Sequence, residues 1–138
     1  MIELADTSAW IVSDRDQATR RAFDDALEAG EIATCDMVKL ELLTGARNAA
    51  ELTATRRDLE ALPQCTIEPD AWRRALDVYE ELARHGGSHH RRVSHPDLLI
   101  AAAAEAAGLG LVHYDADYEV IAAVTGQRTR WIVPRGAI

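Results

Sequence analysis

Short apolar segments alternate with longer helix-forming segments along the whole chain, and this alternation constrains the fold more than any other feature. The apolar runs predict strands at residues 2–5, 32–34, 65–67, 111–114 and 130–133. Apolar spacing, capping residues and Gly or Pro stops predict helices over residues 18–29, 36–44, 49–62, 69–85 and 96–107, and a short one ending at 126. We therefore expect one α/β domain over residues 1–138, with a mostly parallel central sheet of four to five short strands flanked by helices.

The charge balance excludes one large class of function. Fifteen Lys and Arg residues stand against 23 Asp and Glu residues, which gives a formal net charge of −8. Simple attraction to nucleic acid or to an anionic membrane is therefore excluded as the main driving force of binding, and a polyanionic substrate would need cations as intermediaries. The aromatic residues are too few for a platform that stacks successive bases. We expect core or dimer contacts from Trp10, Phe23, Trp72 and Trp131.

The cysteines and the lengths of the apolar runs indicate the cellular compartment in which the protein is expected. Cys35 and Cys65 lie in apolar surroundings without CxxC spacing, which predicts buried, reduced thiols that bind no metal. Residues 1–6 lack the basic start and long apolar region of a signal peptide, and the longest apolar run, residues 98–104, is far short of a membrane span. We therefore expect a cytoplasmic protein with no membrane partner.

Acidic residues follow two of the predicted strands. Asp6 comes directly after residues 2–5, and Asp115 comes directly after residues 111–114. Ligands of open parallel sheets bind beyond the carboxyl ends of the strands, so both carboxylates are expected at one crevice. Each has an alternative role as a helix cap, although capping does not exclude catalysis. Asp97, at the start of a predicted helix, has the alternative role of complementing the helix dipole.

Glu41 lies in an apolar context within the helix predicted over residues 36–44. A step of about 100° per residue places it on the face shared with Met37 and Val38, and leucines flank it in the sequence. We expect partial desolvation of this carboxylate, which leaves a neutral acid, a salt bridge with an Arg, or a cation site. Lys39 lies about 200° around the helix and is excluded as the partner.

Several acids converging on one crevice favour a shared divalent cation. Oxygen ligands in a negatively charged cluster select Mg²⁺ or Mn²⁺, and Mg²⁺ keeps most of its waters while using one or two protein carboxylates. The open positions accept a phosphate group, and one or two such ions acidify a bound water and orient it toward a phosphodiester. The same ions would recruit RNA to an acidic protein.

Residues 86–92 form the one strongly cationic stretch, and they are predicted to be a flexible loop before the helix that carries Asp97. Four of them are candidates for contacts with phosphates that flank a cleaved bond: His89, His90, Arg91 and Arg92. A solvated loop without a ligand is the alternative. A transition-metal site made of histidines alone is a further alternative, but no helical pair would order its ligands.

Four segments, in this order and spacing, resemble the PIN domain, and specifically the small VapC-type toxins of prokaryotic toxin–antitoxin pairs. They are LADTSAW at residues 4–10, VKLELL at 38–43, PDLLIAAAA at 96–104 and HYDAD at 113–117. No single segment is highly specific, whereas the set covers essentially the whole chain. His113 departs from the pattern, because many relatives have Thr or another small residue there. We predict that His113 packs at the strand end rather than acting as a base.

The resemblance implies a site and an activity. It assigns the catalytic acids to Asp6, Glu41, Asp97 and Asp115, the metal ligands to Asp6, Asp97, Asp115 and Asp117, and a supporting hydroxyl to Ser8. It implies an endoribonuclease that depends on Mg²⁺, with Mn²⁺ as a substitute, and that cuts RNA such as tRNA or rRNA. It also implies neutralisation by a cognate VapB-type antitoxin and a homodimer.

Two other functions remain open at this point. A phosphorylated receiver-like domain also gathers acids at strand ends, but it needs a Lys near the phosphoacceptor at a late strand, and Lys39 lies on the side of the second strand. A non-cleaving module would use the acids only to bind RNA or an Arg-bearing partner peptide. Cleavage that a chelator abolishes separates the enzyme from the binding module.

Overall fold

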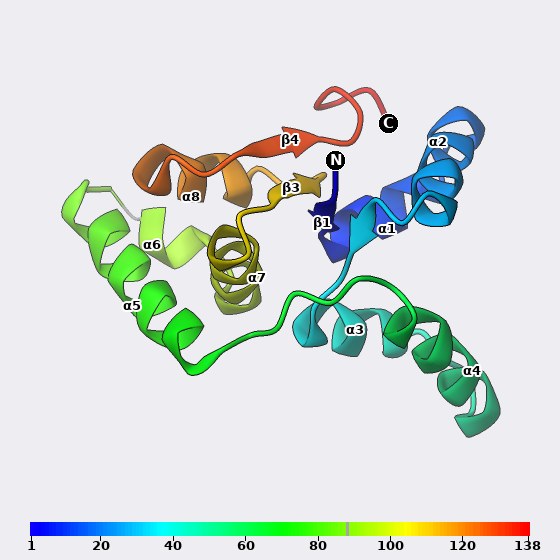
Figure 1. Ribbon diagram of the computed structural model, residues 1–138. Helices are drawn as coiled ribbons and strands as arrows, with labels where there is room; N and C mark the ends of the chain where they lie inside the picture. Colours follow the sequence, from blue (N-terminus) through cyan, green and yellow to red (C-terminus); the bar gives the residue numbers. More distant parts are fainter. Residues whose placement is uncertain (88) are drawn as a thin grey trace.

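The computed structural model describes residues 1–87 and 89–138 (Figure 1). In chain order the elements are β1 (Glu3–Ala5), α1 (Thr7–Ser13), α2 (Gln17–Glu28), β2 (Ile32–Ala33), α3 (Asp36–Leu43), α4 (Ala49–Glu60), α5 (Pro69–Arg84), α6 (His89–Arg92), α7 (His95–Ala106), β3 (Gly110–His113), α8 (Asp117–Thr125) and β4 (Thr129–Trp131). The helices predicted from the sequence are all present, with ends displaced by one or two residues.

The four strands form one parallel sheet in the order β2-β1-β3-β4, which confirms the α/β fold class. In the central pair, Leu4 is in register with Leu111. The strand predicted at residues 65–67 is wrong. That part of the chain forms only an isolated parallel bridge between Gln64 and Thr34, because it turns away toward α5 after one paired residue.

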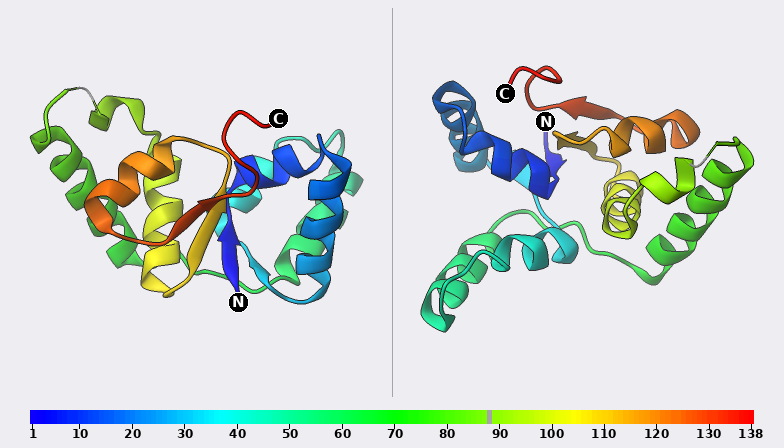
Figure 2. Two further views of the ribbon diagram at one scale, coloured as in Figure 1. Left: turned by 90° about the horizontal axis from the view of Figure 1, so that it is seen from above. Right: turned by 180° about the vertical axis from the view of Figure 1, so that it is seen from behind.

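Successive residues of each central strand face opposite layers of helices. Leu4 and Leu111 belong to the larger core cluster with residues of α3, α5, α7 and α8. Ala5 and Val112, the next residues along, belong to a smaller cluster with Phe23 of α2 and residues of α1. Figure 2 shows α1 and α2 on one side of the sheet and α5, α7 and α8 on the other. Both faces are therefore covered, as buried parallel sheets require.

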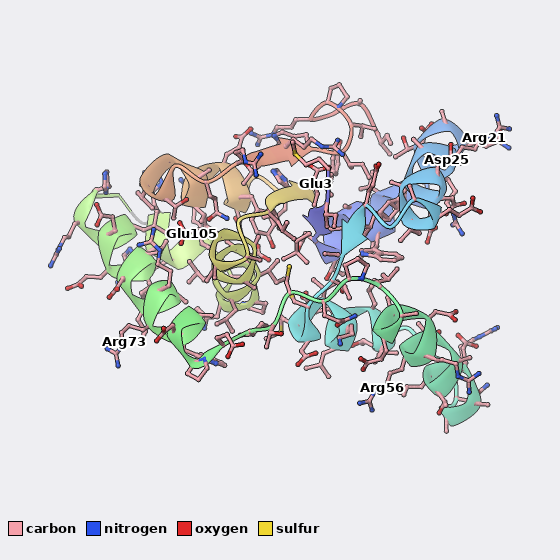
Figure 3. The ribbon with its side chains drawn as sticks, in the orientation of Figure 1. Glu3, Arg21, Asp25, Arg56, Arg73 and Glu105 are labelled. Atoms are coloured by element: carbon pink, nitrogen blue, oxygen red, sulfur yellow. The ribbon has the colours of Figure 1, made fainter. Side chains whose placement is uncertain are left out.

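Helix α7 lies inside the domain, as its sequence predicts. Residues 98–104 are all buried, because the helix is apolar on nearly every side. At its far end, Arg74 of α5 makes two hydrogen bonds to the Glu105 carboxylate, at 2.7 and 3.1 Å. Figure 3 shows Glu105 on the side of α7 toward α5, while Arg73 points to solvent. The ion pair links α5 to the C-terminal end of α7.

The segment predicted as a flexible loop is partly helical. Residues 89–92 form the single turn α6, which follows Gly86 and Gly87. Both glycines have positive φ angles, of 78° and 62°, and this backbone turns the chain back from α5. The prediction of an irregular loop is therefore wrong for residues 89–92, whereas Ser88 lies outside the described residues.

Both cysteines of the chain, Cys35 and Cys65, are buried free thiols, as the sequence predicts. Burial raises the pKa of the Cys35 thiol to about 11.

Within residues 1–87 and 89–138, none of the helices combines the length and the apolar character needed to cross a bilayer.

Candidate metal centre

The acidic site lies where the two central strands end. Asp6 directly follows β1, Asp115 and Asp117 follow β3, and Asp97 stands in the first turn of α7. Because β1 and β3 are adjacent and parallel, their carboxyl ends meet at the same edge of the sheet. The sequence prediction for Asp6 and Asp115 depended on this geometry, and the pairing of β1 with β3 supplies it.

Three carboxylates form a close group. Asp97, Asp115 and Asp117 each offer an oxygen, and these oxygens lie within 4.8 Å of one another. Asp97 is buried, while the two other acids are half-buried. In the described part of the chain, no other set of three or more His, Cys, Asp or Glu side chains meets this spacing. The alternative of a site made of histidines alone therefore has no support in these residues.

Asp6 joins this group through the Tyr118 hydroxyl. The hydroxyl donates to Asp6 Oδ1 at 2.6 Å and lies 3.1 Å from Asp97 Oδ1. The other oxygen of Asp6 caps α1 by accepting the Ser8 amide at 3.0 Å. Asp6 therefore caps α1 through one carboxylate oxygen and contacts the other acids of the site, through Tyr118, with the other oxygen.

Ser8 links the ends of the two central strands. Its hydroxyl donates to Asp6 Oδ2 at 2.5 Å and accepts the Tyr114 amide at 2.9 Å. Tyr114 directly follows β3, so this hydroxyl holds the chain beyond β1 against the chain beyond β3. The geometry is that expected of a residue that orients a ligand.

The N-termini of α7 and α8 are held together at the site. Ser94 caps α7 through its hydroxyl, which accepts the Asp97 amide at 3.3 Å. The Ser94 amide donates to Asp117 Oδ2 at 3.2 Å, and the Asp117 amide donates to Asp115 Oδ1 at 2.9 Å. These bonds connect three acids that come from two separate segments of the chain.

Crowding of negative charge changes the ionisation of the site. Burial, followed by the charges of Asp6 and Asp115 and a hydrogen bond to Asp117, raises the pKa of Asp97 to about 8. Burial, followed by the charges of Asp6 and Asp97 and the hydrogen bonds to them, raises the pKa of Tyr118 well above its usual value, so this hydroxyl stays protonated. Protons thus relieve a repulsion that a divalent cation would relieve in their place.

The environment of the Glu41 carboxylate differs from the one that the sequence predicts. Its carboxylate is exposed rather than desolvated, and it accepts the Thr7 hydroxyl at 2.8 Å. The sequence argument fails because Leu40, its neighbour, is itself 64% exposed, so the flanking leucines do not create an apolar environment. Among the described residues, no Lys or Arg forms an ion pair with Glu41. Thr7 is the neighbour of Asp6 in the chain, which places Glu41 beside the start of α1.

His113 packs under the site, as predicted. It is fully buried, and its ring centroid lies 5.0 Å from those of both Tyr118 and Trp131. Burial lowers the pKa of His113, which favours the neutral ring. Nδ1 accepts the Asp115 amide at 3.2 Å, so the proton of the neutral ring sits on Nε2.

The cationic candidates lie in α6, just before the site. Arg91 and Arg92 are exposed, and in the described part of the chain neither forms an ion pair with an acid. Arg92 also contacts His89 Nδ1 at 2.9 Å, and the ring of His90 stands edge-on to Tyr79. The two guanidinium groups are therefore accessible close to the segment that carries Asp97.

Lys39 has partners away from the acids. Its ammonium lies 2.7 Å from Gln64 Oε1, 2.9 Å from Asp36 Oδ1 and 3.3 Å from Glu60 Oε2. These residues connect α3 with the end of α4 and the chain beyond it. The receiver-like alternative is not supported, because the one lysine of the chain is used in this cluster.

The fold and the acidic site agree with a comparison against known families. The family model of the PIN domain matches residues 4–124. The chain belongs to the PIN-domain family. This PIN domain is 44% identical to ribonuclease VapC18 of Mycobacterium tuberculosis over the full length of both chains. It is 43% identical to ribonuclease VapC51 of the same species, over 88% of this chain and 86% of that protein.

A solved structure shares the fold of this PIN domain. The DNA-bound VapBC structure from Salmonella typhimurium superposes with a TM-score of 0.73, covering 96% of this chain and 100% of that chain at 21% identity. At this identity the likeness concerns the fold. The two sequence relatives above 40% identity place the chain among the VapC ribonucleases of the PIN-domain family.

Tyr118 is the residue of this PIN domain that sequence reasoning missed. The available signal was a tyrosine directly after Asp117, in the first turn of a helix that begins at the acids. A period of 3.6 residues marks such a residue as part of the core, and Tyr118 does pack there. Periodicity does not reveal that the phenol hydroxyl reaches two carboxylates.

Proposed function

We propose that this PIN domain is the ribonuclease toxin of a toxin–antitoxin pair and that it cuts RNA by metal-assisted hydrolysis. The observation that carries the proposal is the group of Asp97, Asp115 and Asp117, with carboxylate oxygens within 4.8 Å of one another and Asp6 attached through Tyr118. The ribonuclease names of two relatives above 40% identity support the same activity.

The donor set fits a hard divalent cation. All candidate ligands are carboxylates, which suit Mg²⁺ and Mn²⁺, and we propose Mg²⁺ with Mn²⁺ as a substitute. Asp6, Asp97, Asp115 and Asp117 would hold the ion, and Glu41 would approach from the side of α1. When bound, such an ion lowers the pKa of a coordinated water and offsets charge that develops on the phosphoryl oxygens.

Residues of the chain itself would orient the reaction. Ser8 and Tyr118 hold the two oxygens of Asp6 in different directions, and Ser94 holds Asp117 against α7. A phosphodiester would bind at the open edge of the sheet with Arg91 and Arg92 beside it, and His89 and His90 would complete the cationic turn. Local cations of this kind offset the net charge of −8.

A VapB-type antitoxin is the proposed protein partner. The structural neighbour from Salmonella typhimurium is a VapBC complex, which supports this pairing. We expect the toxin to act in the cytoplasm, where its RNA substrate would be, and two buried free thiols are compatible with a reducing compartment.

We also propose a homodimer. Trp72 and Leu76, one turn apart on α5, are 59% and 67% exposed. With Tyr79, Leu98 and Leu99 they line a mainly apolar groove of about 370 Å³ between α5 and α7. A two-fold axis would bury the same stripe of both copies at once. We expect a dimer in light scattering, and a monomer after Trp72→Glu.

RNA cleavage by the protein freed of its antitoxin tests the proposed function. We expect cleavage with Mg²⁺, no cleavage after chelation, and recovery on adding Mn²⁺. Asp115→Asn should lower the rate at least about a hundredfold, because changes around metal ligands already cost ten- to a hundredfold. Asp25→Asn, on the exposed side of α2 (Figure 3), is the matched control and should cleave like the parent. RNA binding without chelator-sensitive cleavage would instead support a non-cleaving module.

A further inference from the structure

The Tyr118 hydroxyl is enclosed between two acids of the candidate site. Tyr118 is fully buried, and its hydroxyl lies 2.6 Å from Asp6 Oδ1 and 3.1 Å from Asp97 Oδ1. Asp6 follows β1 and Asp97 belongs to α7, so the hydroxyl connects two elements far apart in the sequence. The shorter distance identifies Asp6 as the carboxylate to which the hydroxyl donates its hydrogen bond.

The protein holds the tyrosine ring rigidly. Tyr118 belongs to the larger core cluster, and its ring lies against the buried His113 with centroids 5.0 Å apart. It stands in the first turn of α8, which begins at Asp117, so one turn of helix places both a carboxylate and the hydroxyl. A ring packed in this way keeps its oxygen in one position, because rotation would displace core side chains.

A fixed donor between two carboxylates has a physical consequence for cation binding. Two like charges at one site repel, and their side chains rotate apart unless something holds them. The hydroxyl anchors Asp6 through Oδ1 while the Ser8 hydroxyl anchors it through Oδ2. The plane of this carboxylate is thereby set, and the remaining lone pairs keep a constant direction relative to Asp97.

We propose that Tyr118 is a positioning residue of the metal centre, whose hydroxyl sets the relative orientation of Asp6 and Asp97 for a divalent cation. The inference rests on the proposed function, because it assumes that the acids bind such a cation. It assigns to Tyr118 a role that acts through these carboxylates, with no direct contact to RNA. Tyr118→Phe retains the packing of the ring and removes only the oxygen.

Titration of the metal-free protein with Mn²⁺ tests the inference directly. Calorimetry, with electron paramagnetic resonance of free Mn²⁺ as a second readout, compares the parent with Tyr118→Phe. We expect the dissociation constant for Mn²⁺ to rise about ten- to a hundredfold in the variant, as for other residues that orient metal ligands. In RNA cleavage, the half-saturating Mn²⁺ concentration should rise by the same factor, while the KM for RNA at saturating Mn²⁺ stays unchanged.

Tyr114→Phe is the matched control. It removes the same atom from a tyrosine whose hydroxyl accepts the Gly136 amide at 2.9 Å and donates to the Ile138 carbonyl at 3.2 Å. Both contacts lie in the C-terminal segment rather than among the acids. We expect this variant to bind Mn²⁺ like the parent, even where its melting temperature falls.

The outcomes separate this inference from the proposed function. A parent that binds Mn²⁺ and a Tyr118→Phe variant with the same dissociation constant overturn the role of Tyr118 and leave the metal centre intact. Lower melting temperature with unchanged Mn²⁺ binding shows a purely structural tyrosine and also overturns it. A parent that binds no Mn²⁺ overturns the metal centre itself and the inference with it.

Discussion

The Ser8 hydroxyl lies 2.5 Å from Asp6 Oδ2, at the junction between β1 and α1. The same hydroxyl oxygen accepts the Tyr114 amide of the neighbouring strand end at 2.9 Å. One small side chain thus orients a candidate metal ligand and joins the two central strands beyond their last paired residues.

Ser8→Ala should therefore impair catalysis more than folding. We expect metal-dependent RNA cleavage to fall about ten- to a hundredfold, because Asp6 loses a partner that orients it. The unfolding free energy should fall by about 1 kcal/mol, since the hydrogen bonds of the hydroxyl are removed. Ser13→Ala is the control, since its hydroxyl donates to the Trp10 carbonyl within α1 at 2.7 Å. Equal losses of activity in both variants would contradict the role of Ser8.

Asp97 should make the stability of the metal-free protein depend on pH. Its pKa is raised from 3.8 to about 8, so the folded state keeps a proton that the unfolded state loses. Stability should therefore decrease as pH rises from about 4 to about 8, by about 1.4 kcal/mol for each unit by which the folded and unfolded pKa values differ. Mg²⁺ should reduce this loss, because it binds the ionised form.

Urea unfolding with chelator at several pH values provides the measurement for Asp97. Asp97→Asn stays uncharged and should flatten the decrease, whereas the exposed Asp25→Asn should retain it. Parallel curves for the parent and Asp97→Asn would show that the perturbed proton sits elsewhere.

Lys39 should stabilise the α3–α4 pair. Its side chain is only 9% exposed, and its ammonium contacts Asp36, Glu60 and Gln64. Lys39→Met should lower the unfolding free energy by about 1–3 kcal/mol, since three polar partners lose the charged donor that the nearly buried lysine supplies. Arg56→Met removes an exposed partner of the same Glu60 and should change stability by about 0.5 kcal/mol or less. The denaturant midpoints of the two variants measure this difference. Equal shifts of the midpoint would contradict the stabilising role of Lys39.

Arg91 and Arg92 should contribute to RNA binding rather than to chemistry. The double change Arg91→Gln with Arg92→Gln should raise the KM for RNA roughly three- to tenfold and leave kcat unchanged, because it removes phosphate contacts. For single-stranded RNA, the logarithmic salt dependence of binding should become shallower by about 0.7 for each phosphate that an arginine no longer neutralises. Arg21→Gln with Arg73→Gln, at two exposed positions on α2 and α5 (Figure 3), also removes two positive charges and controls for net charge. An unchanged KM in the double variant would favour the solvated alternative.

Sequence reasoning succeeded where local pattern and topology agree. Spacing of apolar residues predicted α2, α5 and α7, because amphipathic or wholly apolar helices show their environment in the sequence. Strand ends predicted the neighbourhood of Asp6 and Asp115, because parallel neighbouring strands must end at one edge.

It failed where the environment depends on segments distant in the chain. Residues 65–67 have strand-like composition, but a strand needs a partner along its length, and only Gln64 finds one. Glu41 has leucine neighbours, yet exposure of Leu40 shows that this side of α3 faces solvent. Residues 89–92 form a turn of helix after two glycines, where composition alone indicated a loop.

The sequence by itself determined the α/β alternation, the parallel strands and the acids that meet at their ends. These features follow from the period of apolar residues and from chain connectivity, which are local properties. Only the tertiary structure decided that Tyr118 joins Asp6 to Asp97 and that Lys39 serves the α3–α4 pair. Hydrogen bonds between side chains require donor–acceptor distances that are correct to within a few tenths of an ångström, and only the packed core sets distances so closely.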